Sequence, residues 1–325
     1  MFKLSCLAMT AAAALMASTG VQAQSWPQRP IALVVPQAPG NSPDILARVL
    51  ADKLSRSLGQ QVYVENRTGA ANIVGTQAVA RATPDGYTFL FATSASLSTN
   101  PHTFKKLPYD PLKDFVPVAM AARSHHVLLV NPNLPITSLA ELIAQEKAKP
   151  GEISLAVDSE RNISGLIGQT INRRAGIKMV LVPYASAANS IQDTIAGRVQ
   201  ATIQSASVAE PFIKEGTLRA IAVAGTKRLA SLPDVPAIGE TLASADIGGW
   251  FMVMAPAGTP PEIIQTMGQK IGEILQQADL RERAPTLGFD VDIGPLATPA
   301  GANAFLVKEV AAMGALIKEF GIEPQ

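Results

Sequence analysis

The sequence has few of the residues on which enzyme and metal sites depend. Its one cysteine, Cys6, lies at the start of an N-terminal apolar run, not just after that run's end, which argues against a lipid anchor. A chain cleaved after residue 23 has no disulfide, thiol nucleophile or cysteine ligand. The three histidines, His102, His125 and His126, form no H-E-x-x-H pattern, and adjacent side chains on a strand point to opposite faces. We therefore expect no metal, no cofactor and no catalytic residue.

An excess of charge of one sign is also missing. The 27 Lys and Arg residues nearly equal the 26 Asp and Glu residues, and no basic run stands out. Phosphate backbones select for a strong positive field, so nucleic acid is not an expected partner. No G-x-S-x-G elbow, P-loop or G-x-G-x-x-G pattern follows a predicted strand, which weakens an enzymatic interpretation without excluding it.

The N-terminus has the pattern of a secretory signal peptide. Lys3 is followed by a mostly apolar stretch from Leu4 to Ala17 and by the small-residue site Val21-Gln22-Ala23. The apolar run is too short to span a bilayer, and no later stretch has the roughly 18 consecutive apolar residues that spanning requires. We expect residues 1–23 to be removed and the mature protein to be soluble and periplasmic.

The remaining residues repeat a short β-branched run, a turn and a helical pattern. Ile31 to Val35 reads as a buried strand, and Pro43 to Leu58 as a helix with Leu46, Leu50 and Leu54 spaced by four. Such alternation is typical of α/β proteins whose mainly parallel sheets are flanked by helices. About 300 mature residues favour two domains. Because no linker separates them, we expect the chain to cross between them at Ala119 to His126 and Ala222 to Thr226.

Several loops that follow predicted strands carry small polar residues. In parallel α/β sheets, ligands bind beyond the carboxyl ends of strands, where helix N-termini offer unpaired N–H groups to anions. The candidate loops are Pro36 to Asp44, Thr93 to Ser96, Asp158 to Ser164, Pro183 to Ala187, and Gln204 with Ser205.

Each candidate loop also has a purely structural interpretation. Asn41 and Ser42 serve either as helix caps or as ligand contacts. Arg161 either binds a carboxylate through two parallel hydrogen bonds or pairs with a neighbouring acidic residue. Tyr184 is either a pocket wall or a buried ring with a bonded hydroxyl.

The mature chain resembles the Bug-type (Bordetella uptake gene) receptors, the extracytoplasmic binding components of tripartite tricarboxylate transporters. The resemblance covers almost the whole length and is specific because its motifs occur together and in order. The motifs are Trp26-Pro27-Gln28-Arg29-Pro30-Ile31, Val64-Glu65-Asn66-Arg67, Thr83-Pro84-Asp85-Gly86-Tyr87-Thr88, Asn100-Pro101, Lys105-Lys106-Leu107-Pro108-Tyr109-Asp110-Pro111, Leu232-Pro233-Asp234-Val235-Pro236 and Ala255-Pro256-Ala257-Gly258-Thr259-Pro260.

The resemblance implies a two-domain periplasmic-binding-protein (Venus flytrap) fold, with residues 24–124 plus 226–325 in domain 1 and residues 125–225 in domain 2. The first domain is expected to hold one carboxylate of the solute, and the second to select the remainder. The ligand-binding residues implied in domain 1 are Gln37, Ala38, Gly40, Asn41, Ser42, Thr93, Ser94, Ala95 and Ser96. Those implied in domain 2 are Ser159, Arg161, Asn162, Ser164, Tyr184, Ala185, Ser186, Ala187, Gln204 and Ser205.

Departures from the family pattern suggest the class of solute. The chain has Gln204-Ser205 where relatives have an Asp-Asn pair, and Arg161 in a loop that is usually small and glycine-rich. Loss of an acidic group and gain of a guanidinium would both make the second-domain site more favourable for a negatively charged ligand. We therefore expect an aliphatic or aromatic dicarboxylate. The expected function is capture of this solute by a monomer that delivers it to transporter membrane subunits. The alternatives are a sensor that docks on a signalling receptor and an exported α/β enzyme.

Overall fold

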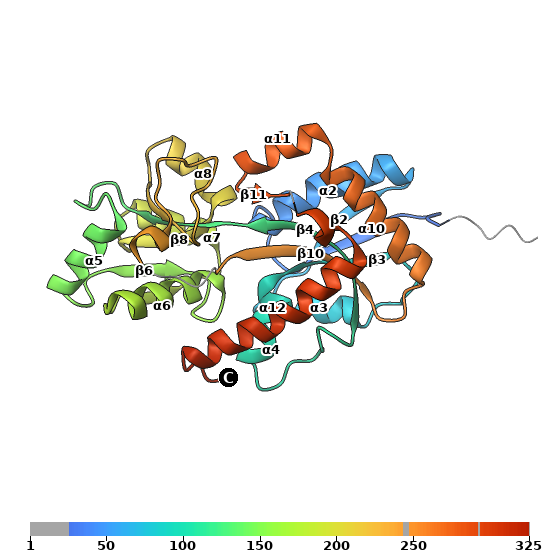
Figure 1. Cartoon of the computed structure of the whole chain (residues 1–325), viewed down its shortest axis with the longest axis horizontal. Helices are drawn as coiled ribbons and strands as arrows, with labels where there is room; N and C mark the ends of the chain where they lie inside the picture. Colours follow the sequence, from blue (N-terminus) through green and yellow to red (C-terminus); the bar gives the residue numbers. More distant parts are fainter. Residues whose placement is uncertain (1–25, 243–246, 292, 325) are drawn as a thin grey trace, which may run out of the picture.

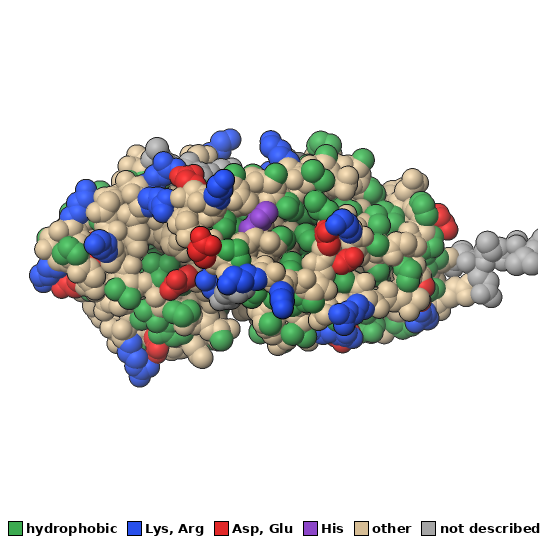
Figure 2. Space-filling model, turned by 90° about the horizontal axis from the view of Figure 1, so that it is seen from below, with side chains coloured by type: hydrophobic (Ala, Val, Ile, Leu, Met, Phe, Trp, Pro, Cys, Tyr) green, Lys and Arg blue, Asp and Glu red, His purple; other side chains and the backbone are tan. Residues whose placement is uncertain are grey.

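Two β-sheets covered by helices make up residues 26–242, 247–291 and 293–324, the part of the chain that the computed structural model describes (Figure 1). The signal peptide predicted for residues 1–23 lies outside these ranges. The α/β class is confirmed. The face drawn in Figure 2 carries basic and acidic side chains side by side, in agreement with the balanced composition.

The first sheet has six strands in the order β11-β4-β10-β3-β1-β2. Their bounds, in that order, are Phe289–Asp290, Phe115–Ser124, Gly249–Pro256, Thr88–Thr93, Ile31–Val35 and Val62–Asn66. The second sheet has five strands in the order β7-β6-β8-β5-β9. Their bounds are Val180–Pro183, Ser154–Val157, Ala201–Ser205, His126–Val130 and Arg219–Val223.

The helices connect these strands and cover both sheets (Figure 1). The α-helices are α2 (Ser42–Leu58), α3 (Ile73–Ala80), α4 (Asn100–Thr103), α5 (Leu139–Ala148), α6 (Ile163–Ala175), α7 (Ala187–Ile195), α8 (Ala206–Lys214), α9 (Ile238–Thr241), α10 (Pro261–Leu275), α11 (Ala278–Thr286) and α12 (Pro299–Glu319). A short π-helix, η1 (Ala95–Thr99), follows β3, and a 3-10 helix, η2 (Gly294–Ala297), precedes α12.

Helix α2 forms as its sequence pattern predicts. Leu46, Leu50 and Leu54 are all buried against the first sheet, and each fully buried leucine contributes about 1.5–3 kcal/mol. Pro43 stands in the first turn, where its missing N–H costs no hydrogen bond. Gly59 ends the helix in the left-handed conformation and donates its N–H to the Ser55 carbonyl.

Both sheets are mixed, whereas the sequence led us to expect mainly parallel ones. β1 is parallel to β2 and β3, and β6 is parallel to β7 and β8. β4 and β10 pair antiparallel with each other, and β5 is antiparallel to β8 and β9. The antiparallel pairs in the first sheet arise because β4 leads to the second sheet and β10 returns from it. A buried apolar strand has the same sequence pattern in either direction, so the pattern did not reveal this.

The first predicted crossing is confirmed, since β4 ends at Ser124 and β5 begins in the other sheet at His126. The second, predicted at Ala222 to Thr226, needs correction. Beyond β9 the chain stays with the second core, where Ile238 and Ile247 are buried. It returns to the first sheet only at β10.

Helix α12 also links the two cores. Ala302 and Leu306 pack in the core of the first sheet, whereas Met313 and Ile317 pack in the core of the second. Helix α12 packs against β4 and η1 and runs toward α6, whose Arg173 donates to the Phe320 carbonyl at 3.1 Å (Figure 1). By length and composition alone this helix could cross a membrane, but the residues it buries, Ala302, Leu306, Met313 and Ile317, are divided between two protein cores. The domain boundaries stay a prediction.

Candidate functional site

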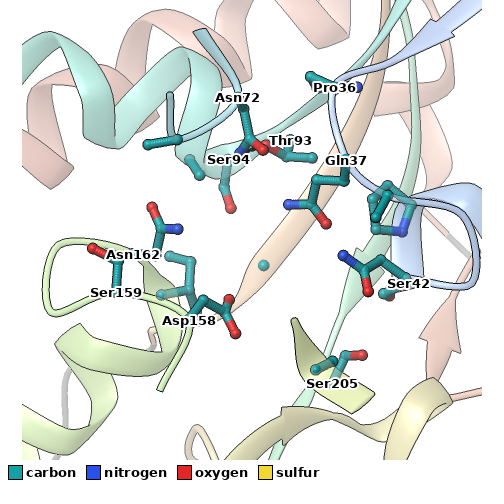
Figure 3. A pocket seen from close by; sticks show the side chains of 18 of the residues that line it. Pro36, Gln37, Ser42, Asn72, Thr93, Ser94, Asp158, Ser159, Asn162 and Ser205 are labelled. Carbon is teal, nitrogen blue, oxygen red and sulfur yellow. Dashed lines mark hydrogen bonds between the residues drawn. The ribbon is translucent and has the colours of Figure 1, made fainter. Parts of the chain in front are cut away.

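A cavity of about 540 Å³ lies between the two halves of the molecule, at the ends of strands from both sheets. Its floor contains Ser124, His126, Gly249 and Phe251, which lie where β4, β5 and β10 pass between the sheets. The first half contributes residues that follow β1, β2 and β3, and the second half contributes residues that follow β6, β7 and β8 (Figure 3).

Four helices begin at the cavity. The N-cap residues of α2, α3, α6 and α8 are Asn41, Asn72, Asn162 and Ser205, and all four line the cavity. None of these side chains makes a capping hydrogen bond. At the start of α3 the N–H groups of Ile73 and Val74 donate to the Ala70 and Gly69 carbonyls, and at the start of α8 the Ala206 N–H donates to the His125 carbonyl, so backbone groups satisfy part of these two helix starts. Helix N-termini carry a partial positive charge, and their convergence favours a negatively charged ligand.

The loop after β1 is held by a buried carboxylate. Asp44 accepts hydrogen bonds from the Gly40 N–H and from Asn66 Nδ2, both at 2.9 Å, and it pairs with Arg48 at 2.9 Å. Burial alone would raise the pKa of Asp44, but the bonds from Arg48, Gly40 and Asn66 outweigh it and hold this pKa below 3.8. Asn66 Nδ2 also donates to the Gln37 carbonyl at 2.9 Å. The loop therefore presents Gln37 and its neighbours in one fixed arrangement.

The loop after β2 lines the cavity, although the sequence prediction omitted it. Ala70, Ala71 and Asn72 have φ values of 45°, 52° and 75°, which place three consecutive non-glycine residues in the left-handed region. Asn100 Nδ2 supports this turn by donating to the Ala71 carbonyl at 2.8 Å. The rule that selected the other loops would have found this one, because residues 67–72 join a predicted strand to a predicted helix.

The loop after β3 divides its residues between lining and support. Thr93, Ser94 and Ala95 line the cavity. Ser96 does not, because its buried hydroxyl donates to the Thr93 carbonyl at 2.8 Å and accepts the Thr93 N–H at 3.1 Å. Ser96 thus holds the loop without reaching a ligand.

The loop after β6 turns a different side chain inward from the one expected. Asp158 lines the cavity, and Figure 3 shows its carboxyl group directed into it. Arg161 does not line it, and its guanidinium donates to the Glu323 carbonyl at 3.4 Å. Ser164 is buried and accepts the Asp158 N–H at 2.9 Å, so it supports the loop from behind. Ser159 and Asn162 line the cavity as predicted.

The loop after β7 and the end of β8 complete the second half. Tyr184 is both a cavity wall and a bonded ring, since its hydroxyl donates to Asp193 at 2.8 Å. Gln204 and Ser205 also line the cavity, but Gln204 Nε2 donates to Ser190 at 2.8 Å and to Thr202 at 2.9 Å. The Gln204 amide nitrogen is therefore bonded within the protein.

Most predicted residues border the cavity, and five do not. The predicted residues that line it are Gln37, Ala38, Asn41, Ser42, Thr93, Ser94, Ala95, Ser159, Asn162, Tyr184, Ala185, Ala187, Gln204 and Ser205. Those that do not are Gly40, Ser96, Arg161, Ser164 and Ser186. Four further lining residues, Pro36, Pro43, Asp158 and Ile163, lie in the candidate loops but were not among the implied ligand contacts. The lining residues outside all candidate loops are Thr68, Gly69, Ala70, Ala71, Asn72, Ser124, His126, Val208, Gly249 and Phe251.

The lining of the cavity carries acidic but no basic charge. Within the described ranges no Lys or Arg lines it. Asp158 is exposed to the open cavity, but the protein that surrounds it partly desolvates its carboxylate and, opposed by a hydrogen bond with the Ser164 hydroxyl, raises its pKa to about 6. Burial and the nearby His125 lower the pKa of His126 to about 4, so its imidazole is uncharged at neutral pH. Among the residues described, no group of three or more His, Cys, Asp or Glu is arranged to hold a metal ion.

Comparison with known proteins identifies the family. The model of the tripartite tricarboxylate transporter family receptor, TctC, matches residues 46–322. The chain belongs to this family. Among its TctC relatives, protein BugT of Bordetella pertussis is 37% identical over 303 residues, which are 93% of this chain and 92% of BugT.

Solved structures agree with this membership. The structure of R. palustris Rpa4515 with adipate is 31% identical, has a TM-score of 0.88, and aligns over 93% of this chain and 100% of its own. The periplasmic binding protein BugD is 30% identical, has a TM-score of 0.85, and aligns over 92% of this chain and 100% of its own. The expected TctC receptor fold, that of a periplasmic binding protein, is confirmed.

Proposed function

We propose that this TctC-family protein captures a small carboxylate in the cavity and delivers it to the membrane subunits of a tripartite transporter. The observation that carries the proposal is the convergence of four helix N-termini, none with a side-chain capping bond, on a cavity without Lys or Arg in the described residues. N–H groups at helix starts bind an anion without a side-chain cation. The adipate in the Rpa4515 structure supports a carboxylate as the ligand class.

Capture requires the ligand to stabilise a closed arrangement of the two halves. Ser207 Oγ, in α8, donates to Ser42 Oγ, in α2, at 3.0 Å, so the halves already meet beside the cavity. A carboxylate that contacts both halves binds the closed form more tightly than an open one and shifts the population toward it. We propose that the mature protein does this as a periplasmic monomer, after removal of the signal peptide predicted for residues 1–23.

The expectation of a dicarboxylate loses its original basis. It rested on Arg161, which lies outside the cavity lining, and on the loss of an acidic group, whereas Asp158 supplies one. We therefore propose only that the solute carries at least one carboxylate.

A thermal-shift screen of residues 24–325 against mono-, di- and tricarboxylates and aromatic acids tests capture. A ligand at 100 times its dissociation constant stabilises the folded state by about 2.7 kcal/mol, which shifts the midpoint of a chain this long by several degrees. No shift with any carboxylate would contradict the proposal. Deleting the membrane subunits tests delivery, because uptake of the bound solute then stops, whereas a sensor protein would leave uptake intact.

A further inference from the structure

Asp158 is placed to meet a ligand. It directly follows β6, and its carboxyl group points into the cavity from the second half, toward the side on which Gln37 and Ser42 lie (Figure 3). Its backbone N–H donates to Ser164 Oγ at 2.9 Å, which fixes the residue at the start of the loop. A close approach of α6 also restrains this loop, since a Cβ at Gly165 would overlap the Ser159 carbonyl oxygen.

Nothing else in the described lining balances this carboxylate. The other titratable side chains there are His126 and Tyr184. His126 is uncharged at neutral pH, and its buried Nδ1 has no hydrogen-bond partner. The Tyr184 hydroxyl already donates to Asp193. The residues that the first half contributes to the lining include no titratable side chain.

The two halves of the cavity therefore differ in charge. The first half offers the N-termini of α2 and α3, which favour an anionic group, with no opposing charge, whereas in the second half the carboxylate of Asp158 lies beside the N-termini of α6 and α8. A second ligand carboxylate beside an ionised Asp158 would be repelled by several kcal/mol at contact distance, even at an effective dielectric constant of about 20. A group that donates hydrogen bonds would be held there, most strongly if it is cationic.

We propose that Asp158 selects solutes that carry a hydrogen-bond donor, above all an ammonium group, at the end opposite the carboxylate. This inference rests on the proposed capture of a carboxylate and specifies its substrate class as ω-amino carboxylates. Asp158 acts as a specificity-determining residue, while the first half holds the carboxylate that all candidate solutes share.

The test compares three ligands of equal length by calorimetric titration of residues 24–325 at pH 7.5. Each set contains a diacid, the ω-amino acid and the monoacid, such as adipate, 6-aminohexanoate and hexanoate, with sets at four, five and six carbons and one built on benzene. In the best-fitting set the ω-amino acid is expected to bind about 10-fold or more tighter than the diacid and the monoacid, the scale of a hydrogen bond to a charged group.

Two variants identify the residue responsible. Asp158→Asn should weaken binding of the ω-amino acid about 10-fold or more and strengthen binding of the diacid. Glu160→Gln is the matched control, because it removes the same charge two residues away, outside the lining, and should change either affinity less than about 2-fold.

The dependence on pH has opposite signs for the two ligand classes. An ammonium group binds ionised Asp158, so affinity for the ω-amino acid should fall as pH decreases through 6, where Asp158 takes up a proton. His126, with a pKa of about 4, does not titrate in this range. Diacid affinity that exceeds that of the ω-amino acid at pH 7.5, or ω-amino acid affinity that does not fall as pH decreases through 6, overturns the inference but leaves the proposed function standing. If no carboxylate binds, both fail.

Discussion

The two halves of the cavity are built from the same elements, strand ends that lead into helix starts, but they present different chemistry. In the first half, the Asp44 carboxylate and the Ser96 hydroxyl form hydrogen bonds with the backbone of their own loops, and the residues that line the cavity are uncharged. In the second half, the supporting hydroxyl of Ser164 holds a loop whose carboxylate, Asp158, faces the cavity. The first half is therefore suited to a group common to many solutes, and the second to distinguishing among them.

This difference implies that the same added charge has opposite consequences in the two halves. A carboxylate already exists in the second half, where it is proposed to select the ligand. One introduced into the first half would oppose the helix N-termini that receive the ligand carboxylate.

The largest effect is expected for Ala38→Asp. Ala38 lines the first half and is exposed, so the new side chain fits without disturbing the fold. Repulsion between two carboxylates near the protein surface reaches a few kcal/mol, so carboxylate affinity should fall about 100-fold or more. Calorimetric titration measures it, and Ala38→Asn is the isosteric control without charge. An equal loss in both variants would mean that shape, not charge, matters at this position.

The next effect concerns the support of the first half. Asp44→Asn should lower the free energy of unfolding by about 2 kcal/mol at pH 7, because the buried carboxylate accepts several hydrogen bonds and pairs with Arg48. The pKa of Asp44 is lowered by folding, so its contribution is present above pH 3.8 and is lost as pH falls through the folded-state value.

Urea unfolding of wild type and variant across this pH range checks the prediction. The difference between them should shrink below pH 3.8. Asp52→Asn removes an exposed partner of Arg56 on the same helix and should cost less than about 1 kcal/mol. Equal losses for Asp44 and Asp52 would show that the first half is not held in the manner described.

A smaller effect is expected at the support of the second half. Gly165→Ala places a Cβ against the Ser159 carbonyl and Glu160 backbone, so the loop that carries Asp158 must shift. The overlap costs about 1–3 kcal/mol, partly offset by the better helix propensity of alanine, for a net loss of about 1 kcal/mol. Gly272→Ala, in α10, meets only an ordinary contact and should be neutral or stabilising.

Thermal unfolding measures both glycine variants. A shifted loop should also alter the preference between diacid and ω-amino acid, because it moves Asp158. If Gly165→Ala keeps wild-type stability and preference, the loop is not restrained by α6.

The smallest effect is expected for Arg161→Ala. Its side chain lies outside the cavity lining, so affinity for mono- and dicarboxylates should change by less than about 0.5 kcal/mol, the scale of exposed ionic contacts. Parallel titrations of a diacid and its monoacid check this. A selective loss of diacid affinity would restore Arg161 as a ligand contact and remove the reason for assigning selection to Asp158.

More of the fold than of the site could be predicted from the sequence. The spacing of apolar residues and the positions of turn residues located helices and strands, because these signals are local. In α2, for example, the spacing of Leu46, Leu50 and Leu54 determines which face of the helix is buried. They did not locate the return to the first sheet, because Ile238 and Ile247 are apolar residues that fit either core. That choice is made by tertiary packing, which local pattern does not encode.

The site residues show the same limit at the scale of one loop. Strand-exit position correctly placed Ser159 and Asn162 at the cavity, but a loop has no regular period to tell whether Asp158 or Arg161 faces inward. The loop that contains Ala70 to Asn72 satisfied the same strand-exit rule, but its left-handed conformation could not be predicted, because non-glycine residues rarely adopt it. Asn100, distant in sequence, supports it.

Recognition of a carboxylate by the cavity can be measured with pairs of ligands that differ only in that group. Residues 24–325 are titrated calorimetrically with mono- and dicarboxylates, ω-amino carboxylates and aromatic acids, each beside its primary amide. The account predicts that at least one acid binds and that its amide binds about 100-fold more weakly, since the amide lacks the charge that the helix N-termini favour. An amide that binds as tightly as its acid, or a series in which no acid binds, would contradict it.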